Sequence, residues 1–433
     1  MQDLINVVLI LAWPVICCLF FLKLETIPAT FVSLVGGMLI LPVKVQLDLP
    51  LIPAIDKNVS ASIGALVGIL IIHKKTFNWF GSHRTKYLIL AILTIPFVNL
   101  FFNTHPHFTG AAWKPGLSLH EALSAVLLTY LTLLPLIIGV NVVKSENDLY
   151  RILKYFVVAA LLYLPLVFFE LRFSPQLHNI VYGFHPHEFI QQIRAGGFRS
   201  VVFLGHGLLT ANFYLGGFIA LLLLSKMKRN FISRNIHVTL ILVLLCGLIL
   251  LKSVTAVLLA IVAVVLLNIN HNLRRKSMKS IVLGVAIYPL IVFFGLLPLD
   301  WLYENLQTFI SIERIESLYF RFTNEKMAID YLGLNIFVGF GGLGRAVMDG
   351  IITDGSWLVW TLRYGAVFWF LCVFLCCKPL FYSTQNTNLS QQLVILSVLP
   401  VVILIDQVPN SSWSLVWCWF YSGALIGYSE SRH

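Results

Sequence analysis

The stretch ALSAVLLTYLTLLPLIIGVNVV, residues 122–143, decides the fold class of this chain because it contains no charged side chain. As an α-helix these residues would extend about 33 Å, enough to cross the roughly 30 Å hydrocarbon core of a bilayer. Lipid offers the backbone no hydrogen-bond partners, so a helix is the form expected of such a segment. The stretch therefore predicts a transmembrane helix.

Similar apolar runs recur almost from end to end of the 433 residues. The chain is 58% hydrophobic and 11% charged, whereas soluble domains are about 25% charged. The runs predict an all-α, polytopic transmembrane bundle of 12 or 13 spans that forms one domain over residues 1–433. Besides the stretch above, they are Leu4–Leu22, Ile27–Leu41, Val59–Ile72, Tyr87–Phe102, Tyr155–Phe169, Val201–Leu224, Val238–Leu251, Val254–Leu267, Ile281–Leu297, Trp357–Cys377, Leu393–Ile405 and Trp413–Tyr428.

Basic residues predict the orientation of the bundle. Clusters within residues 74–86, 144–154, 226–234 and 274–279 would all face one side of the membrane, which the positive-inside rule makes cytoplasmic. The N-terminus lacks a basic region and a small-residue cleavage site, so we expect an anchor there and not a cleaved signal peptide. The topology of the first 58 residues stays open because both early spans are short.

Composition excludes several classes of protein. Membrane topology accounts for most of the net charge of +11, so nucleic acid is not an expected partner. All seven cysteines lie inside apolar runs, which argues against a disulfide framework or a thiolate metal site. No Walker-type glycine loop occurs on the cytoplasmic side, and we expect neither nucleotide chemistry there nor a cofactor.

The second expected outer loop, residues 172–200, carries two candidate anion-binding arginines. Arg194 and Arg199 flank a Gly-Gly pair just before an apolar run that contains His206. If a helix begins near Arg199, then Arg199 and His206 share one face, because seven residues make about two turns. Glu188 belongs to a short amphipathic segment suited to the membrane interface. A single arginine at a helix end could simply extend its side chain to the lipid headgroups. Two arginines on either side of a glycine pair favour a site that binds an anion.

The third outer loop, residues 298–356, is the longest polar stretch of the chain. Its periodicity predicts one helix over Ile312–Phe322, which includes Arg321. Thr323 is predicted to be the N-cap of a second helix, Asn324–Leu332, which would end at the following glycine.

A glycine-rich segment, residues 338–344, follows in the same loop and leads into Arg345. Its glycines allow close backbone approach and positive φ angles. The backbone N–H groups could cradle a phosphate, and a plain flexible connector is an equal alternative.

Arg363 lies six residues inside the expected span that begins at Trp357. A lipid-facing arginine at that depth costs at least ~2.5 kcal/mol, so it should face a partner or a hydrated cavity. Asp406 and Asp354 are the candidate partners. A structural ion pair and a functional site remain alternatives.

Two His-Pro-His motifs invite a zinc hypothesis, at residues 105–107 and 185–187. The middle proline is no ligand, and no acidic or cysteine partner shows metal-ligand spacing. We therefore expect no metal site.

These residues resemble the O-antigen polymerase and O-antigen ligase superfamily. A large outer loop whose arginines precede a helix is followed by a longer outer loop and then a span, as in that family. The matching motifs are Arg194-x-x-Gly197-Phe198-Arg199, Arg321 with Lys326–Ala328 and Phe337–Gly344, and Asp354–Leu358 with Leu362–Val367.

Two departures bear on the choice within the superfamily. Phe337 stands where a proline usually precedes the glycine run, and Asp354 stands where ligases often have a histidine. The second departure puts a ligase-type histidine base in doubt and favours a polymerase.

The resemblance implies a GT-C-like fold in the bacterial cytoplasmic (inner) membrane, with the active side facing the periplasm. It implies a metal-independent glycosyltransferase that polymerises undecaprenyl-pyrophosphate-linked oligosaccharide units. Donor and acceptor would both be lipid-linked, and membrane lipids, a chain-length regulator or a flippase would be further partners. The alternatives are an O-antigen ligase acting on lipid A core or protein and a flippase for lipid-linked sugars.

The site residues follow from this chemistry. The departing lipid pyrophosphate needs preorganised cations, and the arginine fork binds phosphate bidentately. We expect Arg194, Arg199, Arg321 and Arg345 to bind the pyrophosphate and Arg363 to support them. The candidates for the base that accepts the hydroxyl proton are, in order, Asp354, His206 and Glu188.

Overall fold

The computed structural model of the chain describes residues 2–49, 52–110, 112–194, 196–227, 233–298, 301, 305, 312–346, 350–382 and 388–432. The structure is 75% helical, which confirms the all-α expectation. Within these ranges, seven helices are long and apolar enough to cross a membrane, by length and composition. Among the described residues, these seven helices and five shorter apolar ones correspond to all of the expected spans except Trp413–Tyr428. That run forms most of the 16-residue helix α20 (Val416–Ser431), which is not among the candidate spans.

The helical elements fall into three groups by length and polarity. The helices of spanning length are α1 (Gln2–Lys23), α5 (His83–Phe102), α6 (Leu119–Val142), α7 (Glu146–Phe173), α9 (Gly207–Lys226), α12 (His271–Phe293) and the consecutive pair α18 (Asn388–Leu396) and α19 (Val398–Asp406). The shorter apolar ones are α2 (Thr26–Phe31) with η1 (Val32–Gly36) and α3 (Gly37–Ile40), α4 (Lys57–Val67) with η2 (Gly68–Ile72), α10 (Arg234–Leu250), α11 (Val254–Asn268) and α17 (Ala366–Tyr382). The others are α8 (Leu177–Tyr182), η3 (Phe189–Gln192), α14 (Ile312–Leu332), η4 (Gly333–Phe337), α15 (Leu343–Ala346), α16 (Ser356–Tyr364) and α20 (Val416–Ser431).

Strands are confined, in the described part of the chain, to three short antiparallel hairpins in the connections between helices. They are β1 (Leu47–Leu49) with β2 (Ile52–Ile55), β3 (His107–Phe108) with β4 (Trp113–Lys114), and β5 (Ile193–Arg194) with β6 (Gly197–Phe198).

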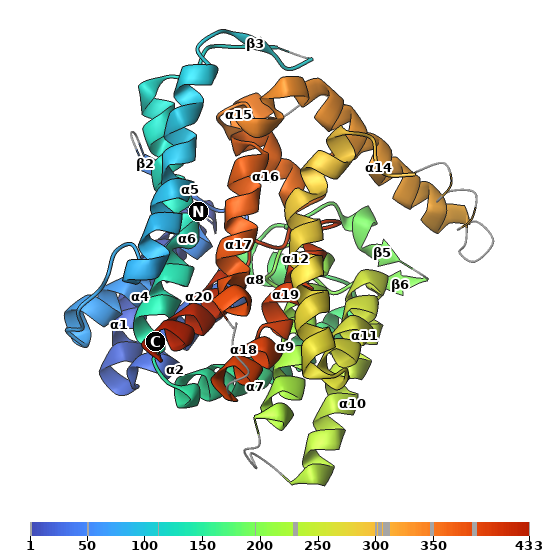
Figure 1. The fold of residues 1–433 in the computed structure, drawn as a ribbon. Coiled ribbons are helices and arrows are strands. Elements are labelled where there is room, and N and C mark those ends of the chain that lie inside the picture. Colours follow the sequence, from blue (N-terminus) through green and yellow to red (C-terminus); the bar gives the residue numbers. More distant parts are fainter. Residues whose placement is uncertain are drawn as a thin grey trace.

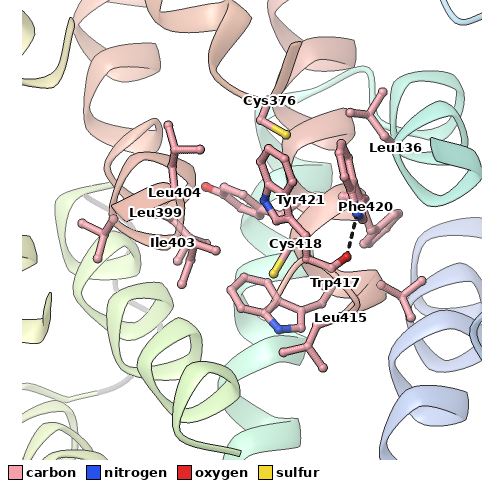
Figure 2. Close-up of a cluster of buried hydrophobic side chains, with 14 of the residues drawn as sticks. Leu136, Cys376, Leu399, Ile403, Leu404, Leu415, Trp417, Cys418, Phe420 and Tyr421 are labelled. Atoms are coloured by element: carbon pink, nitrogen blue, oxygen red, sulfur yellow. Dashed lines mark hydrogen bonds between the residues drawn. The ribbon is translucent and has the colours of Figure 1, made fainter. Parts of the chain in front are cut away.

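Helices α6 and α20 approach each other closely because glycines line their contact. A Cβ atom on Gly139 of α6 would lie 2.6 Å from the backbone nitrogen of Ala424, and one on Gly423 of α20 would overlap the Leu136 carbonyl oxygen. Small residues allow this approach in a bilayer, where dispersion contacts drive helix association. Around the contact, side chains such as Trp417 and Tyr421 form a buried apolar cluster, which Figure 2 shows.

Helix α14 lies across one end of the bundle, where α12 ends and α16 begins (Figure 1). Helix α15 and the β3–β4 hairpin lie at the same end, at the top of that view. We call this the α14 end. It contains the described part of the third loop, and its helices are too polar or too short to be candidate spans.

The expectation of two helices in the third loop is wrong. A single helix, α14, covers Ile312–Leu332, and Thr323 lies in its interior. No proline or glycine interrupts residues 312–332, so nothing in the backbone ends the helix at Thr323. Gly333, with φ of 51°, ends it as expected.

The expected span Trp357–Cys377 is divided into α16 and α17. Gly365 stands between them with φ of 87°, which glycine adopts without strain. A Cβ atom there would overlap the Phe337 carbonyl oxygen, so the break is where η4 packs into the bundle. The short helix α16 thereby belongs to the α14 end and not to a continuous span.

Candidate functional site

Arg321 of α14 forms an ion pair with Asp354, which lies in the segment before α16. Its Nε atom is 3.2 Å from Oδ2 of Asp354, and the two side chains are 31% and 42% exposed. Its Nη1 atom also donates to the carbonyl oxygen of Pro409, at 3.3 Å. The structure thus brings together two residues selected separately from the sequence. A solvent-accessible guanidinium paired with a carboxylate can exchange that partner for an anionic ligand.

Glu325 lies one turn further along α14 and was missed by the sequence analysis. It is 7% exposed, and its Oε2 atom accepts a hydrogen bond from the phenol of Tyr288 on α12, at 2.9 Å. Burial raises the pKa of Glu325 to about 7, because desolvation penalises the charged carboxylate more than the Tyr288 hydrogen bond favours it. The available signal was the i, i+4 spacing from Arg321, which places both side chains on one face of a helix.

Asp354 is held in place by the start of α16, two residues further along the chain. The Ser356 hydroxyl donates to Oε1 of Gln407 at 2.8 Å, and the Ser356 backbone N–H donates to the Asn410 carbonyl at 3.2 Å. Both partners belong to the segment between α19 and α20 that also contains Pro409. Arg321 therefore contacts two segments that are bonded to each other.

A buried polar network lies behind this contact, centred on Asp406 at the end of α19. Asn212 of α9 and Asn410 each donate a side-chain N–H to the carboxylate at 2.7 Å, and the Ser412 hydroxyl donates at 2.9 Å. Three donors satisfy a carboxylate that is only 4% exposed. The network fixes α9 and α19 relative to each other at the level of the Arg321 contact.

The structural ion pair, one of the two alternatives for Arg363, is not formed with Asp406 or Asp354 among the residues that the structure describes. Asp406 is bonded to amides and a hydroxyl, and Asp354 pairs with Arg321. The backbone carbonyl oxygen of Arg363 accepts hydrogen bonds from the Gly341 N–H at 2.8 Å and from Nδ2 of Asn99 at 3.2 Å. A pairing between distant segments is not visible in the local sequence, which is why the sequence left both alternatives open.

Arg345 is a buried residue, 6% exposed, that donates hydrogen bonds to backbone carbonyls. Its Nε atom donates to Phe340 at 3.0 Å, Nη2 donates to His105 at 3.3 Å, and Nη1 donates to Pro115. These bonds attach the glycine-rich segment to the connection between α5 and α6. The observed contacts of Arg345 are structural, and they lie apart from the bonds that Arg321 makes.

The helix that follows the second loop begins later in the chain than the sequence predicted. Helix α9 begins at Gly207 and His206 is its N-cap, so Arg199 lies outside the helix and shares no helical face with His206. Residues 199–202 are extended or turned because the carboxylate of Glu170 accepts the Val201 and Val202 N–H groups, each at 2.8 Å. Arg199 is 7% exposed, and its Nη2 donates to the Lys252 carbonyl at 3.3 Å.

The other candidates of this loop make contacts with residues of the same loop. Glu188 is exposed and accepts a hydrogen bond from Gln191 at 3.2 Å, and the amphipathic segment is a short 3₁₀ turn, η3. The His206 ring packs edge-on against the His187 ring, with 4.9 Å between centroids. The backbone of Arg194 pairs in the β5–β6 hairpin, and its side chain lies outside the described part.

Both His-Pro-His motifs are placed by contacts of other kinds. His107 stacks on Phe340 at 4.3 Å between centroids, and its Nε2 shares a hydrogen bond with the Tyr331 hydroxyl. His185 packs against Phe189. No group of three or more histidine, cysteine, aspartate or glutamate side chains gathers in the described ranges. Zinc therefore has no candidate ligand set there.

The fold and this end of the bundle define a multi-pass helical membrane protein with an exposed arginine–carboxylate pair beside a buried carboxylic acid. Comparison of the chain with protein-family models, with curated proteins and with solved structures gives no match. The class thus rests on the chain's own helices and composition.

Proposed function

We propose that this protein is a membrane glycosyltransferase that polymerises undecaprenyl-pyrophosphate-linked oligosaccharide units at the outer face of a bacterial cytoplasmic membrane. The observation that carries the proposal is the Arg321–Asp354 ion pair at the α14 end, with Glu325 one turn away. Such a transfer requires an anion-binding group and a base, and this site has an arginine and two carboxylates.

Arg321 would bind the donor pyrophosphate by exchanging its carboxylate partner. The guanidinium stays charged and can bond two phosphate oxygens at once, and its contact with Asp354 is at the Nε atom, at 3.2 Å. Exchange would release the Asp354 carboxylate beside the bound donor. The ion pair thus holds both groups next to each other.

The transfer itself is a displacement at the anomeric carbon of the donor sugar. The acceptor hydroxyl oxygen forms a bond to that carbon, and the bond from the carbon to the pyrophosphate oxygen breaks. The lipid pyrophosphate leaves with the bonding electron pair, and Arg321 stabilises its charge. The hydroxyl proton passes to a carboxylate, for which Asp354 is the exposed candidate and Glu325 the buried one.

The remaining arginines take roles that follow from their contacts. Arg199 stays a candidate for the second phosphate or for the acceptor lipid, and so does Arg194. Arg345 and Arg363 would position the glycine-rich segment, since the contacts that involve them run along it. We therefore assign them an indirect part in pyrophosphate binding.

The test compares Arg321→Lys and Arg321→Ala with Lys326→Gln, which removes an exposed charge from the same helix. Polymer length on a gel and the leaflet that holds lipid-linked units are measured in cells. Lysine retains the charge and loses the fork, so both Arg321 variants should reduce the rate by about 10²–10³ and accumulate single units in the outer leaflet. Lys326→Gln should make polymer of normal length.

Three outcomes contradict the proposal in different ways. Normal polymer from Arg321→Lys removes the arginine from the mechanism. Units confined to the inner leaflet identify a flippase. Intact polymer that fails to reach lipid A core or protein identifies a ligase.

A further inference from the structure

A groove of about 300 Å³ lies between α12 and α17, away from the ion pair described above. Its walls are apolar apart from Lys279 and Ser280 of α12. Leu283 of α12 and Phe370 of α17 line it and are 55% and 42% exposed, so the groove opens on the outside of the bundle. Because α12 is a helix of spanning length, this outside surface is the one that faces lipid.

Lys279 gives the groove a cationic end. From Ser280 to Phe293 helix α12 has no charged residue, whereas Arg275 and Lys276 precede Lys279 in the basic part of the helix. Lys279 is therefore the last cation before the apolar part, at the depth where lysine side chains reach lipid headgroups. Its Nζ atom lies 5.4 Å from the ring centroid of Phe381, at the end of α17.

The apolar part of the groove leads away from this cation. Ala286 lines it two turns further along α12, and the interval from Lys279 corresponds to about 10 Å of helix. The small side chain of Ala286 leaves room that Leu283 and Phe370 border. A charged end and an apolar channel of this kind complement a molecule with an anionic head and a hydrocarbon tail.

We propose that the groove binds one anionic glycerophospholipid, whose phosphate contacts Lys279 and whose acyl chain lies along α12 toward Ala286. Attraction between a lysine and an anionic headgroup selects the lipid class, and burial of the chain in the groove contributes the apolar part of the affinity. The site is independent of the glycosyltransferase proposal, because none of its residues belongs to the α14 end.

The test measures binding of phosphatidylglycerol and of phosphatidylcholine to the purified full chain by native mass spectrometry. Lys279→Gln removes the cation, and Lys276→Gln is its matched control on the same helix, outside the groove lining. Ala286→Trp fills the groove, and Val264→Trp places the same side chain at an exposed position of α11. Thermal unfolding of each variant establishes that it is folded.

We expect Lys279→Gln to weaken phosphatidylglycerol binding about fivefold and to leave phosphatidylcholine binding unchanged, as the loss of one lysine–headgroup attraction predicts. Ala286→Trp should reduce the binding of both lipids, and the two controls should match the unaltered chain. Equal phosphatidylglycerol affinity in Lys279→Gln and the unaltered chain would overturn the proposal. A dimer that Ala286→Trp dissociates would assign the groove to a second copy instead.

Discussion

The guanidinium of Arg321 meets the carboxylate of Asp354 at 3.2 Å, while the same guanidinium contacts the Pro409 carbonyl at 3.3 Å. One side chain of α14 therefore bridges the segment before α16 and the segment between α19 and α20. Those two segments are also joined directly, through Ser356 and Gln407. Because Ser356 anchors the chain two residues beyond Asp354, that carboxylate is positioned beside Arg321.

Replacement of Asp354 by asparagine separates a role in stability from a role in the reaction. An ion pair as exposed as this one contributes about 0–1 kcal/mol, so the melting temperature should change little. As the proton acceptor, Asp354 should be worth about 10²–10⁴ in rate, and Asp354→Asn should make short or no polymer. Asp330→Asn, an exposed change on α14, is the control. Full-length polymer from Asp354→Asn would show that another residue accepts the proton.

Glu325 should make the stability of the protein depend on pH. The pKa of its carboxyl rises from the ordinary glutamate value of 4.5 to about 7 in the folded chain, so the folded state binds more protons between these values. The free energy of unfolding should therefore fall as pH rises from about 4.5 through about 7, by up to roughly 3 kcal/mol.

Glu325→Gln tests this dependence because it removes the titrating group. Its melting temperature in detergent, followed by tryptophan fluorescence, should lose the part of the decline from about pH 4.5 through about pH 7 that Glu325 causes in the unaltered chain. Glu316→Gln, at an exposed position on the same helix, should keep the full decline. Parallel pH curves for Glu325→Gln and the unaltered chain would show that Glu325 does not titrate in this range.

The contact between α6 and α20 should be intolerant of a single methyl group. A Cβ atom on Gly423 would overlap the Leu136 carbonyl oxygen, so Gly423→Ala forces two helix backbones apart and should destabilise the protein by about 1–3 kcal/mol. Gly284→Ala on α12 is the matched control, because no atom lies within 4 Å of its added Cβ. Thermal unfolding measures both variants. A stable Gly423→Ala protein would contradict the close packing of these helices.

The expected orientation places the α14 end outside the cell. A cysteine at Leu334, whose side chain is 85% exposed at this end, should react with an impermeant thiol reagent in intact cells. A cysteine at Lys276, in the basic part of α12, should react only after the membrane is opened. The unaltered chain, with its native cysteines, provides the background. The reverse pattern of labelling would invert the topology and place Arg321 on the cytoplasmic side.

Composition and hydropathy were enough to predict an all-α membrane protein, because an uncharged run such as residues 122–143 has one stable form in a bilayer. Glycine at positions 333 and 365 marks where helices end, although only the first was predicted. Gly365 by itself does not predict the end of a helix, since glycines are also common inside membrane helices. The break there depends on η4, which packs against it from an earlier part of the chain.

In the candidate site, too, the sequence indicated the residues and the tertiary structure determined their contacts. Arg321 and Asp354 were each selectable from their residue types, and their contact depends on how the long third loop folds over α12 and α16. Glu325 became notable only when Tyr288 and the surrounding helices buried it, and Arg345 turned toward carbonyls of a distant loop. The local sequence determined which segments are helical and apolar, because these depend on neighbouring residues. Tertiary structure alone decided which charged groups meet, because burial and partners come from segments far apart in the chain.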